Sequence, residues 1–332
     1  MTCAECSYCP YLLILTGAAL MLCCIIKFRN AITIAKGMLL KKNHGISLLH
    51  GMHLSLMVIF FAGYCVVFYF LIRGIQSAGI LFVAIGFFFG ALFALLSIVL
   101  QLDTLSSIKV QHESIKLANQ QLLQTESVTI FTLAHQAELR GLETGKHIER
   151  TAHYVRLLAQ GLSEMPKYRS YLVSGYIADI EKSAPLHDIG MVAVPDSILK
   201  KPGKLTPEEF EIVKTHCENG ARLLRTADGK LSFQSFLKIA VQMVASHHEK
   251  WNGKGYPRGL ADESIPLSGR IMALADVYDA LRSDYPYKKR LSHEEACKII
   301  AKEKGEHFDP DIVEVFSSIE SKFHEISVGL AG

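Results

Sequence analysis

The segment at residues 246–257 carries the strongest chemical signal in the chain, and it reads Ser246-His247-His248-Glu249-Lys250-Trp251-Asn252-Gly253-Lys254-Gly255-Tyr256-Pro257. Its two adjacent histidines end an apolar run at residues 239–245 and open a stretch rich in glycine. Neutral imidazole is the commonest metal ligand in proteins, and glycine lets the backbone approach a ligand closely. A histidine pair alone is more often a helix end than a metal site, so a metal site also requires ligands from elsewhere.

Further candidate ligands occur on both sides of this segment. Glu143 and His147 are four residues apart, a spacing that places both on one face of a helix. The others are His187, Asp188, His216 and Asp276. Taken singly, a residue of any of these types is more often an ordinary surface or core-edge residue than a metal ligand. Five histidines and three carboxylates in one helical region together predict a metal site.

The ligand types indicate a class of metal and of reaction. Mixed imidazole and carboxylate ligands suit iron, manganese or zinc better than magnesium or calcium, which prefer oxygen. A carboxylate such as Asp188 can bridge two metals. Metals about 3.5–4 Å apart stabilise both oxygens of an in-line phosphoryl displacement and lower the pKa of a bound water to about 7. Metal-assisted phosphodiester hydrolysis is the predicted chemistry.

The region that holds these ligands, residues 125–325, is predicted to be all-α. Its apolar periodicity is helical throughout, without an alternating strand pattern of useful length. Thr206, followed by Pro207 and Glu209, predicts a helix start with a capping box. Asp309-Pro310 predicts the start of the last helix in the same way.

The first third of the chain is predicted to lie in a membrane. Half of the 332 residues are apolar and the mean hydropathy is +0.24. Uncharged stretches at residues 7–26, 45–72 and 74–102 each exceed the ~20 residues that a spanning helix needs. We expect three transmembrane helices at about residues 8–28, 50–72 and 77–101 within a membrane region 1–102. The first stretch could instead be a cleaved signal peptide, but it lacks a basic segment before it.

Basic residues in the connections predict the orientation of these helices. The second connection carries Arg73 alone, whereas the first has no acidic residue and carries Lys27, Arg29, Lys36, Lys41 and Lys42. The positive-inside rule then places the N-terminus outside and the C-terminal domain in the cytosol. We therefore expect a multi-pass membrane protein. The net charge of only +3 gives no case for binding a nucleic acid polymer.

Two smaller features each allow a functional and a plain interpretation. Cys3, Cys6 and Cys9 are either a sensory metal or redox cluster or ordinary cysteines, because three thiols without a fourth ligand do not define a zinc or iron–sulfur site. The connector at residues 103–124 has Ile108, Ile115 and Leu122 at heptad spacing. It is either a helix that forms a homodimer through this seam or a solvated helix.

Beside this chemistry, the motifs resemble those of the HD-GYP family, a subset of the HD phosphohydrolases, over residues 125–325, with 326–332 as a tail. The motifs are Glu143-Thr144-Gly145-Lys146-His147, His187-Asp188-Ile189-Gly190, residues 198–206, His247-His248-Glu249, Gly255-Tyr256-Pro257, residues 276–281 and Phe308-Asp309-Pro310. The resemblance implies a bacterial cyclic di-GMP phosphodiesterase that yields pGpG and often GMP. It also implies two or three divalent metals, iron or manganese, and signalling partners such as a diguanylate cyclase.

The resemblance also implies a role for each matching residue. The implied metal ligands are Glu143, His147, His187, Asp188, His216, His247, His248 and Asp276, with His187 and Asp188 as the catalytic pair. Substrate contacts are implied for Gly255, Tyr256, Pro257 and Lys288.

Two positions depart from the family pattern. Met191 stands where the family usually has lysine, and Tyr285 stands where it usually has arginine. Lys250 or Lys254 could partly replace the missing cations. These departures leave two alternatives open: a metal-loaded but catalytically weak effector that binds cyclic di-GMP or a protein, and an enzyme for another cyclic dinucleotide.

Overall fold

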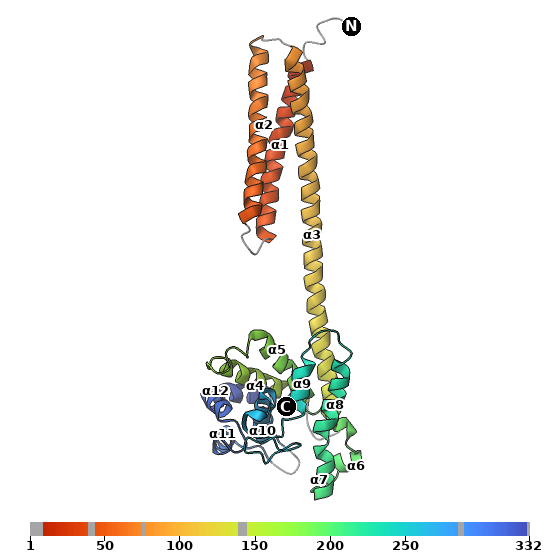
Figure 1. Ribbon diagram of the computed structural model, residues 1–332, viewed down its shortest axis with the longest axis vertical. Coiled ribbons are helices and arrows are strands. Elements are labelled where there is room, and N and C mark those ends of the chain that lie inside the picture. Colours follow the sequence, from red (N-terminus) through yellow and green to blue (C-terminus); the bar gives the residue numbers. More distant parts are fainter. Residues whose placement is uncertain (1–8, 39–43, 75–77, 139–144, 285–288, 331–332) are drawn as a thin grey trace. The chain divides into compact units, whose positions relative to one another are not determined.

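The computed structural model describes residues 9–38, 44–74, 78–138, 145–284 and 289–330, and these residues form helices and no strand (Figure 1). The all-α prediction is therefore confirmed. The chain divides into two compact units, Met1–Gln121 and Leu122–Gly332. The first unit contains α1 (Cys9–Met38), α2 (His44–Ile72) and most of α3 (Ala78–Glu138), whose last residues belong to the second unit.

Buried side chains of the first unit recur every seven residues on all three helices. They are Ile14, Met21 and Phe28 on α1, Met57, Tyr64 and Leu71 on α2, and Ala84, Ala91 and Ile98 on α3. A seven-residue repeat keeps one seam of each helix facing its partners. Gly17 allows a close approach, because a Cβ there would lie 2.5 Å from the Tyr64 ring. The first unit is thus a bundle in which α1 packs closely on α2 and all three helices share one apolar cluster.

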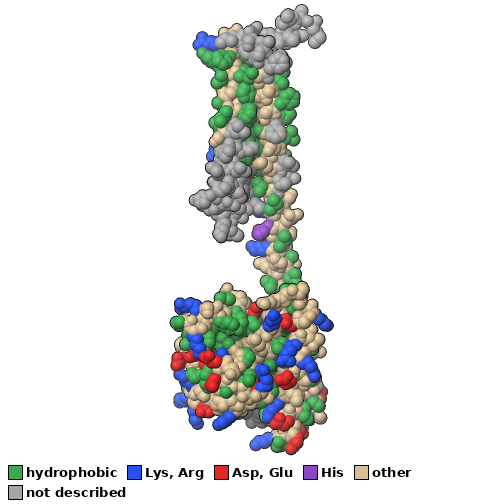
Figure 2. Space-filling view, in the orientation of Figure 1, with side chains coloured by type: hydrophobic (Ala, Val, Ile, Leu, Met, Phe, Trp, Pro, Cys, Tyr) green, Lys and Arg blue, Asp and Glu red, His purple; other side chains and the backbone are tan. Residues whose placement is uncertain are grey.

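The outward face of this bundle is also apolar. Large exposed side chains include Leu12, Leu15, Leu22, Ile26, Val58, Ile59, Val66, Phe70, Val83, Phe89 and Leu96 (Figure 2). Helices that are apolar on every side belong in a large protein core or a membrane. Among the described residues, the segment Tyr11–Asn30 of α1 is long and apolar enough to span a bilayer, whereas Met57–Ile72 and Val83–Val99 are shorter. The prediction of three spans is therefore not confirmed.

The second unit contains nine further α-helices among the described residues. They are α4 (Gly145–Ser163), α5 (Ser174–Ser183), α6 (Asp196–Leu199), α7 (Pro207–Lys214), α8 (His216–Asp228), α9 (Leu237–Val244), α10 (Leu267–Arg282), α11 (His293–Lys302) and α12 (Pro310–Gly329). Short 3₁₀ turns η1 (Ala184–Leu186), η2 (Ile189–Ala193) and η3 (Asp262–Ser264) connect some of them.

Local sequence signals explain where several of these helices begin. The predicted capping box at α7 is confirmed, since the Glu209 N–H donates to the Thr206 hydroxyl and the Glu209 carboxylate accepts from the Thr206 N–H. Asp309 begins α12 by accepting the Asp311 N–H at 2.8 Å. Such caps satisfy backbone donors that a helix leaves unpaired at its first turn.

The core of this unit is centred on α10, which packs against α4, α9, α11 and α12. Tyr278 on α10 is fully buried, and its ring packs edge-on against Tyr154 of α4 at 5.3 Å. Tyr154 in turn stacks on Phe323 of α12 at 4.4 Å. Because α10 is fixed on several sides, carboxylates on its remaining face have a defined position.

A close approach of two backbones joins η2 to α8. A Cβ on Gly190 would lie 1.9 Å from the His216 carbonyl oxygen and 2.6 Å from the Gly220 nitrogen. Only glycine fits at position 190 without moving the first turn of α8. This contact holds residues 187–190 beside the start of α8.

We predict that Gly190→Ala lowers the free energy of unfolding of the second unit by at least about 1–3 kcal/mol, because the added methyl overlaps backbone atoms. Urea unfolding followed by the fluorescence of Trp251, the single tryptophan of the chain, measures this change. Gly175→Ala is the control, since a Cβ at Gly175 meets no atom within 4 Å. Equal effects of the two substitutions would contradict the packing argument.

Candidate metal centre

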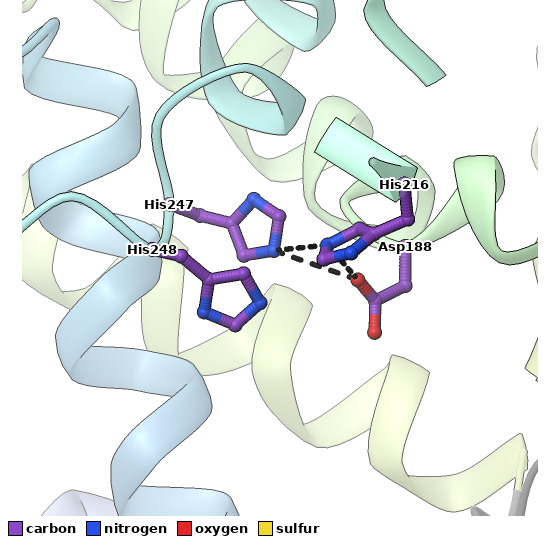
Figure 3. Close-up of side chains that lie close together, drawn as sticks. All are labelled: Asp188, His216, His247 and His248. Carbon is purple, nitrogen blue, oxygen red and sulfur yellow. Dashed lines mark hydrogen bonds and ion pairs between the residues drawn. The ribbon is translucent and has the colours of Figure 1, made fainter. Parts of the chain in front are cut away.

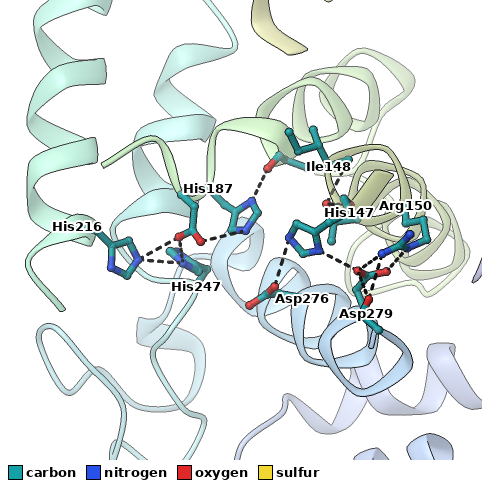
Figure 4. A network of polar contacts seen from close by, with 12 residues as sticks. His147, Ile148, Arg150, His187, His216, His247, Asp276 and Asp279 are labelled. Carbon is teal, nitrogen blue, oxygen red and sulfur yellow. Dashed lines mark hydrogen bonds and ion pairs between the residues drawn. The ribbon is translucent and has the colours of Figure 1, made fainter. Parts of the chain in front are cut away.

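The described ligand candidates come from five separate segments of the second unit and converge on one region (Figure 4). His147 lies in the first turn of α4, and Asp276 lies on α10. His187 and Asp188 lie between η1 and η2. The remaining candidates are His216, the first residue of α8, and His247 and His248, which follow α9.

One group consists of Asp188, His216, His247 and His248, each of which offers one ligand atom within 4.8 Å of the others (Figure 3). Oδ1 of Asp188 lies 3.2 Å from Nε2 of His216 and 3.5 Å from Nε2 of His247. The two Nε2 atoms are 3.4 Å apart. Ligand atoms that share a metal with bonds of about 2.0–2.2 Å have separations of this size.

A second group lies on the other side of Asp188. Glu138, His147 and His187 offer ligand atoms within 4.8 Å of one another. Oδ2 of Asp188 lies 3.8 Å from Nε2 of His187. Asp276 adds a carboxylate, with Oδ1 at 3.7 Å from Nε2 of His147. The two oxygens of Asp188 therefore face two different groups of ligands.

The histidines are oriented by hydrogen bonds at the ring nitrogen that faces away from the centre. Nδ1 of His187, His216 and His247 lies 2.9, 2.8 and 3.0 Å from the carbonyl oxygens of Ala184, Val213 and Val244. An Nδ1–H that donates to a carbonyl leaves the lone pair of Nε2 for a metal. Nε2 of His187 is buried and has no hydrogen-bond partner among the described residues. These donor atoms fit divalent metals.

Burial and mutual contact set the protonation of this site in the absence of metal. Burial lowers the pKa of His187 and of His248, so both rings are neutral. Burial acts to raise the pKa of Asp188, but the neighbouring imidazoles outweigh it and hold that pKa well below its usual range. Burial also acts to lower the pKa of His216, yet the Asp188 carboxylate outweighs this effect and raises it to about 11. A metal that binds His216 must therefore displace a proton.

An ion pair that the sequence analysis missed orients His147. Asp279 accepts two hydrogen bonds from the Arg150 guanidinium, Nε–Oδ1 at 2.6 Å and a second to Oδ2 at 2.8 Å. Its Oδ2 also lies 2.8 Å from Nδ1 of His147. Asp276 and Asp279 are one turn apart on α10 and thus face the two nitrogens of one imidazole. The spacing of three residues between Asp276 and Asp279 indicates that both lie on one face of a helix. No sequence pattern indicates a role for Arg150.

Glu138 is a third residue that the sequence analysis missed. It ends α3, is buried, and belongs to the ligand group of His147 and His187. The predicted ligand Glu143 lies outside the described residues, as do Tyr285 and the predicted substrate contact Lys288.

The Gly-Tyr-Pro loop lies against the first ligand group. The Tyr256 ring stacks on His248 with ring centroids 4.7 Å apart. A Cβ on Gly255 would lie 2.3 Å from the Lys250 nitrogen, so this position requires glycine. The buried carboxylate of Glu249 accepts backbone N–H groups on both sides of the following turn, from Arg258 at 2.8 Å and Leu260 at 3.0 Å. Pro257, the third predicted contact, is half-buried in the same loop.

Met191 lies in η2 and donates its backbone N–H to the Asp188 carbonyl oxygen at 2.9 Å. Met191, which departs from the family pattern, is therefore one 3₁₀ turn away from Asp188 along the chain.

A model of the HD domain family matches residues 143–312, just over half of the chain. The chain belongs to the HD domain family. The recognition of this family from the sequence motifs is therefore confirmed, and the convergent histidines and aspartates described above belong to its HD domain.

Curated relatives of this HD domain are named as cyclic dinucleotide phosphodiesterases. A "Cyclic di-GMP phosphodiesterase" of Vibrio cholerae is 49% identical over 215 residues, covering 65% of this chain and 44% of the relative. One of the same name from Thermotoga maritima is 39% identical, covering 57% and 48%. A "3'3'-cGAMP-specific phosphodiesterase 2" of Vibrio cholerae is 40% identical, covering 63% and 38%. The matches thus span less than half the length of these relatives.

We predict that replacing both His187 and Asp188 by alanine removes metal from the purified chain, because the bridging carboxylate and a ligand of the second group are lost together. Elemental analysis should give less than one metal per chain in the variant. Asp196→Asn, at an exposed position of α6, is the control and should keep the original content. Unchanged metal content in the double variant would refute the ligand assignment.

We further predict that Asp279→Asn weakens metal binding about 10–100-fold, as loss of a residue that orients a ligand typically does. It should also lower the free energy of unfolding by about 3–5 kcal/mol, because the buried Arg150 then loses its bidentate carboxylate partner. Metal titration and urea unfolding measure the two effects. Wild-type metal affinity in this variant would show that Asp279 does not position His147.

Proposed function

We propose that this chain is a metal-dependent phosphodiesterase that hydrolyses cyclic di-GMP to pGpG and GMP and is anchored in a bacterial inner membrane. The observation that carries the proposal is the position of Asp188, whose Oδ1 faces His216 and His247 while its Oδ2 faces His187. A carboxylate shared between two ligand groups suits a two-metal phosphodiesterase. The names of the relatives from Vibrio cholerae and Thermotoga maritima support the same substrate.

One metal would be held by Asp188, His216, His247 and His248, and a second by His147, His187, Asp188 and Asp276, with Glu138 or Glu143 able to add a carboxylate for a third. The nitrogen and oxygen donors suit iron or manganese. When bound, such metals would supply Lewis-acid stabilisation of the phosphate and acidify the attacking water. Hydrolysis adds this water to phosphorus and breaks one P–O3′ bond, which opens the ring to linear pGpG.

Protein groups around the ligands would position the substrate. The Tyr256 ring, held against His248, offers a face on which a guanine base can stack, a contact worth about 1–3 kcal/mol. The ammonium of Lys214 lies 5.6 Å from the centre of the same ring. It pairs with the Glu211 carboxylate at 2.6 Å and would be the nearest described cation to a phosphate bound over this ring. The buried rings of His147, His187, His216 and His247 would keep bulk water away from the ligand atoms.

A second candidate substrate is 3'3'-cGAMP. The observation in its favour is the 40% identity to a Vibrio cholerae relative whose name specifies this dinucleotide. The two substrates differ in one base, so the contacts at Tyr256 rather than the ligand set would separate them. An effector with little turnover is the remaining alternative, and Met191 and Tyr285, the two departures from the family pattern, favour it.

The membrane anchor rests on the character of the first unit. Its helix α1 contains one segment that can span a bilayer, and the outward faces of α2 and α3 expose further large apolar side chains. We retain the three-span topology, with the N-terminus outside, as part of the proposal. Ile108, Ile115 and Leu122 are all exposed on α3 and would form the seam of a homodimer.

We predict that the full-length chain, loaded anaerobically with ferrous iron or manganese, hydrolyses cyclic di-GMP. Product analysis by chromatography should show pGpG or GMP, and the His187/Asp188 double-alanine variant should form neither. Faster hydrolysis of 3'3'-cGAMP would favour the second candidate. Full metal content with tight dinucleotide binding and no turnover would overturn the enzymatic proposal in favour of the effector.

We also predict that Met191→Lys raises kcat/KM about 10–100-fold, because a charge-assisted phosphate contact is worth about 1.5–3 kcal/mol. Val192→Lys, at the exposed neighbouring position, is the matched control for added charge alone. An equal gain in both variants would indicate general electrostatic attraction of the substrate instead of a specific contact.

A further inference from the structure

A separate group of metal-ligating side chains lies between α11 and α12, which pack against each other (Figure 1). His293 and Cys297 are one turn apart on α11, and Glu320 lies on α12. One ligand atom from each of the three lies within 4.8 Å of the other two. None of these residues belongs to the HD centre, and neither the sequence motifs nor the relatives assign them a role.

The distance between the first two ligands fits a tetrahedral metal. The Cys297 Sγ lies 3.6 Å from each ring nitrogen of His293. Bonds of about 2.3 Å from zinc to sulfur and about 2.0–2.1 Å to nitrogen, at a tetrahedral angle, place these atoms about 3.6 Å apart. Because Sγ is equally far from Nδ1, it lies over the ring, and a rotation of the Cys297 or His293 side chain is needed to direct Sγ and the Nε2 lone pair at one cation.

His293 is also oriented as a ligand would be. Its Nδ1 lies 2.9 Å from the hydroxyl oxygen of Tyr278. Tyr278 is fully buried on α10 and is fixed by the aromatic core. If Nδ1–H donates to this oxygen, the lone pair of Nε2 is free for a metal. A hydrogen bond from the outer nitrogen is the usual support for a metal-bound histidine.

We propose that His293, Cys297 and Glu320 bind a divalent cation of the zinc class. His324 follows Glu320 by one turn, is exposed, and has its ring 4.8 Å from that of His293. It supplies a fourth ligand by a change of rotamer, or water takes that position. The thiolate makes this donor set softer than the nitrogen and oxygen donors of the HD centre, so the two sites select different metals.

A cation at this position would join α11 to α12 and tie both to α10 through Tyr278. Tyr278 precedes Asp279, the residue that orients His147, and follows Asp276 by two positions. The second site would therefore be structural. It would stabilise the position of α10, the helix that carries Asp276 and Asp279 of the HD centre. Its occupancy should stabilise this part of the fold, as a ligand that binds only the folded state does.

The test uses cobalt(II) as a probe, because a thiolate bound to cobalt absorbs in the near ultraviolet whereas imidazole and carboxylate ligands do not. The full-length chain carries Cys3→Ser, Cys6→Ser and Cys9→Ser to remove the N-terminal thiols. After removal of metals, cobalt titration should give one thiolate-bound cobalt per chain, and zinc should displace it. Absence of the thiolate band at saturating cobalt would refute the site.

Single substitutions then assign the thiolate. Cys297→Ser should abolish the band, and Cys217→Ser should retain it. Cys217 is the alternative source, since its Sγ lies 3.4 Å from Nε2 of His216 in the HD centre. A band that persists in Cys297→Ser and disappears in Cys217→Ser would place the thiolate ligand at the HD centre and overturn the proposal.

The remaining ligands are tested by affinity. His293→Ala and Glu320→Gln should weaken cobalt binding at the thiolate site at least tenfold. Tyr278→Phe keeps the core ring and should weaken it about 10–100-fold through the lost hydrogen bond. Lys298→Ala and Glu325→Gln, exposed on the same two helices, are matched controls that should bind as wild type. Unchanged affinity in both His293→Ala and Glu320→Gln would refute the ligand set.

Discussion

The second unit depends on keeping one charged carboxylate, that of Asp188, largely enclosed by imidazole rings, with 17% of its side chain exposed. A buried charge is costly unless it is paired, and here the partners are the Nε2 atoms of His187, His216 and His247. Each partner comes from a different segment of the chain, so the site exists only when η1, α8 and the segment after α9 are packed together. The close backbone contact between Gly190 and Gly220, neither of which has a Cβ, is one consequence of this packing.

Much of this arrangement could be predicted because the signals are local. Helical periodicity, the capping box at Thr206 and the residue types of the ligands are all properties of short stretches of sequence. The ligand candidates could be named before their distances were known. Five histidines and three carboxylates in one helical region are typical of a metal site.

The remainder could not be predicted because it depends on contacts between distant residues. Arg150 and Asp279 are separated by 129 positions, and their ion pair has no local signature. Glu138 lies before the first motif, which begins at Glu143. It reaches the site because α3 ends there, and the sequence motifs do not indicate this position. Two of the three predicted spans are not confirmed for a different reason: among the described residues, the apolar segments Met57–Ile72 of α2 and Val83–Val99 of α3 are shorter than the spanning segment of α1.

The hydrogen bonds that orient the histidines give the two ligand groups unequal tolerance of sequence change. His187, His216 and His247 each use the carbonyl oxygen of the residue three positions earlier. Every amino acid supplies that oxygen, so evolution can vary Ala184, Val213 and Val244 without losing the acceptors. His147 instead depends on a side chain, that of Asp279. One of the two metal positions can therefore be weakened by a single substitution outside its own ligands, at Asp279, whereas the orientation of His216 and His247 at the other depends on backbone acceptors.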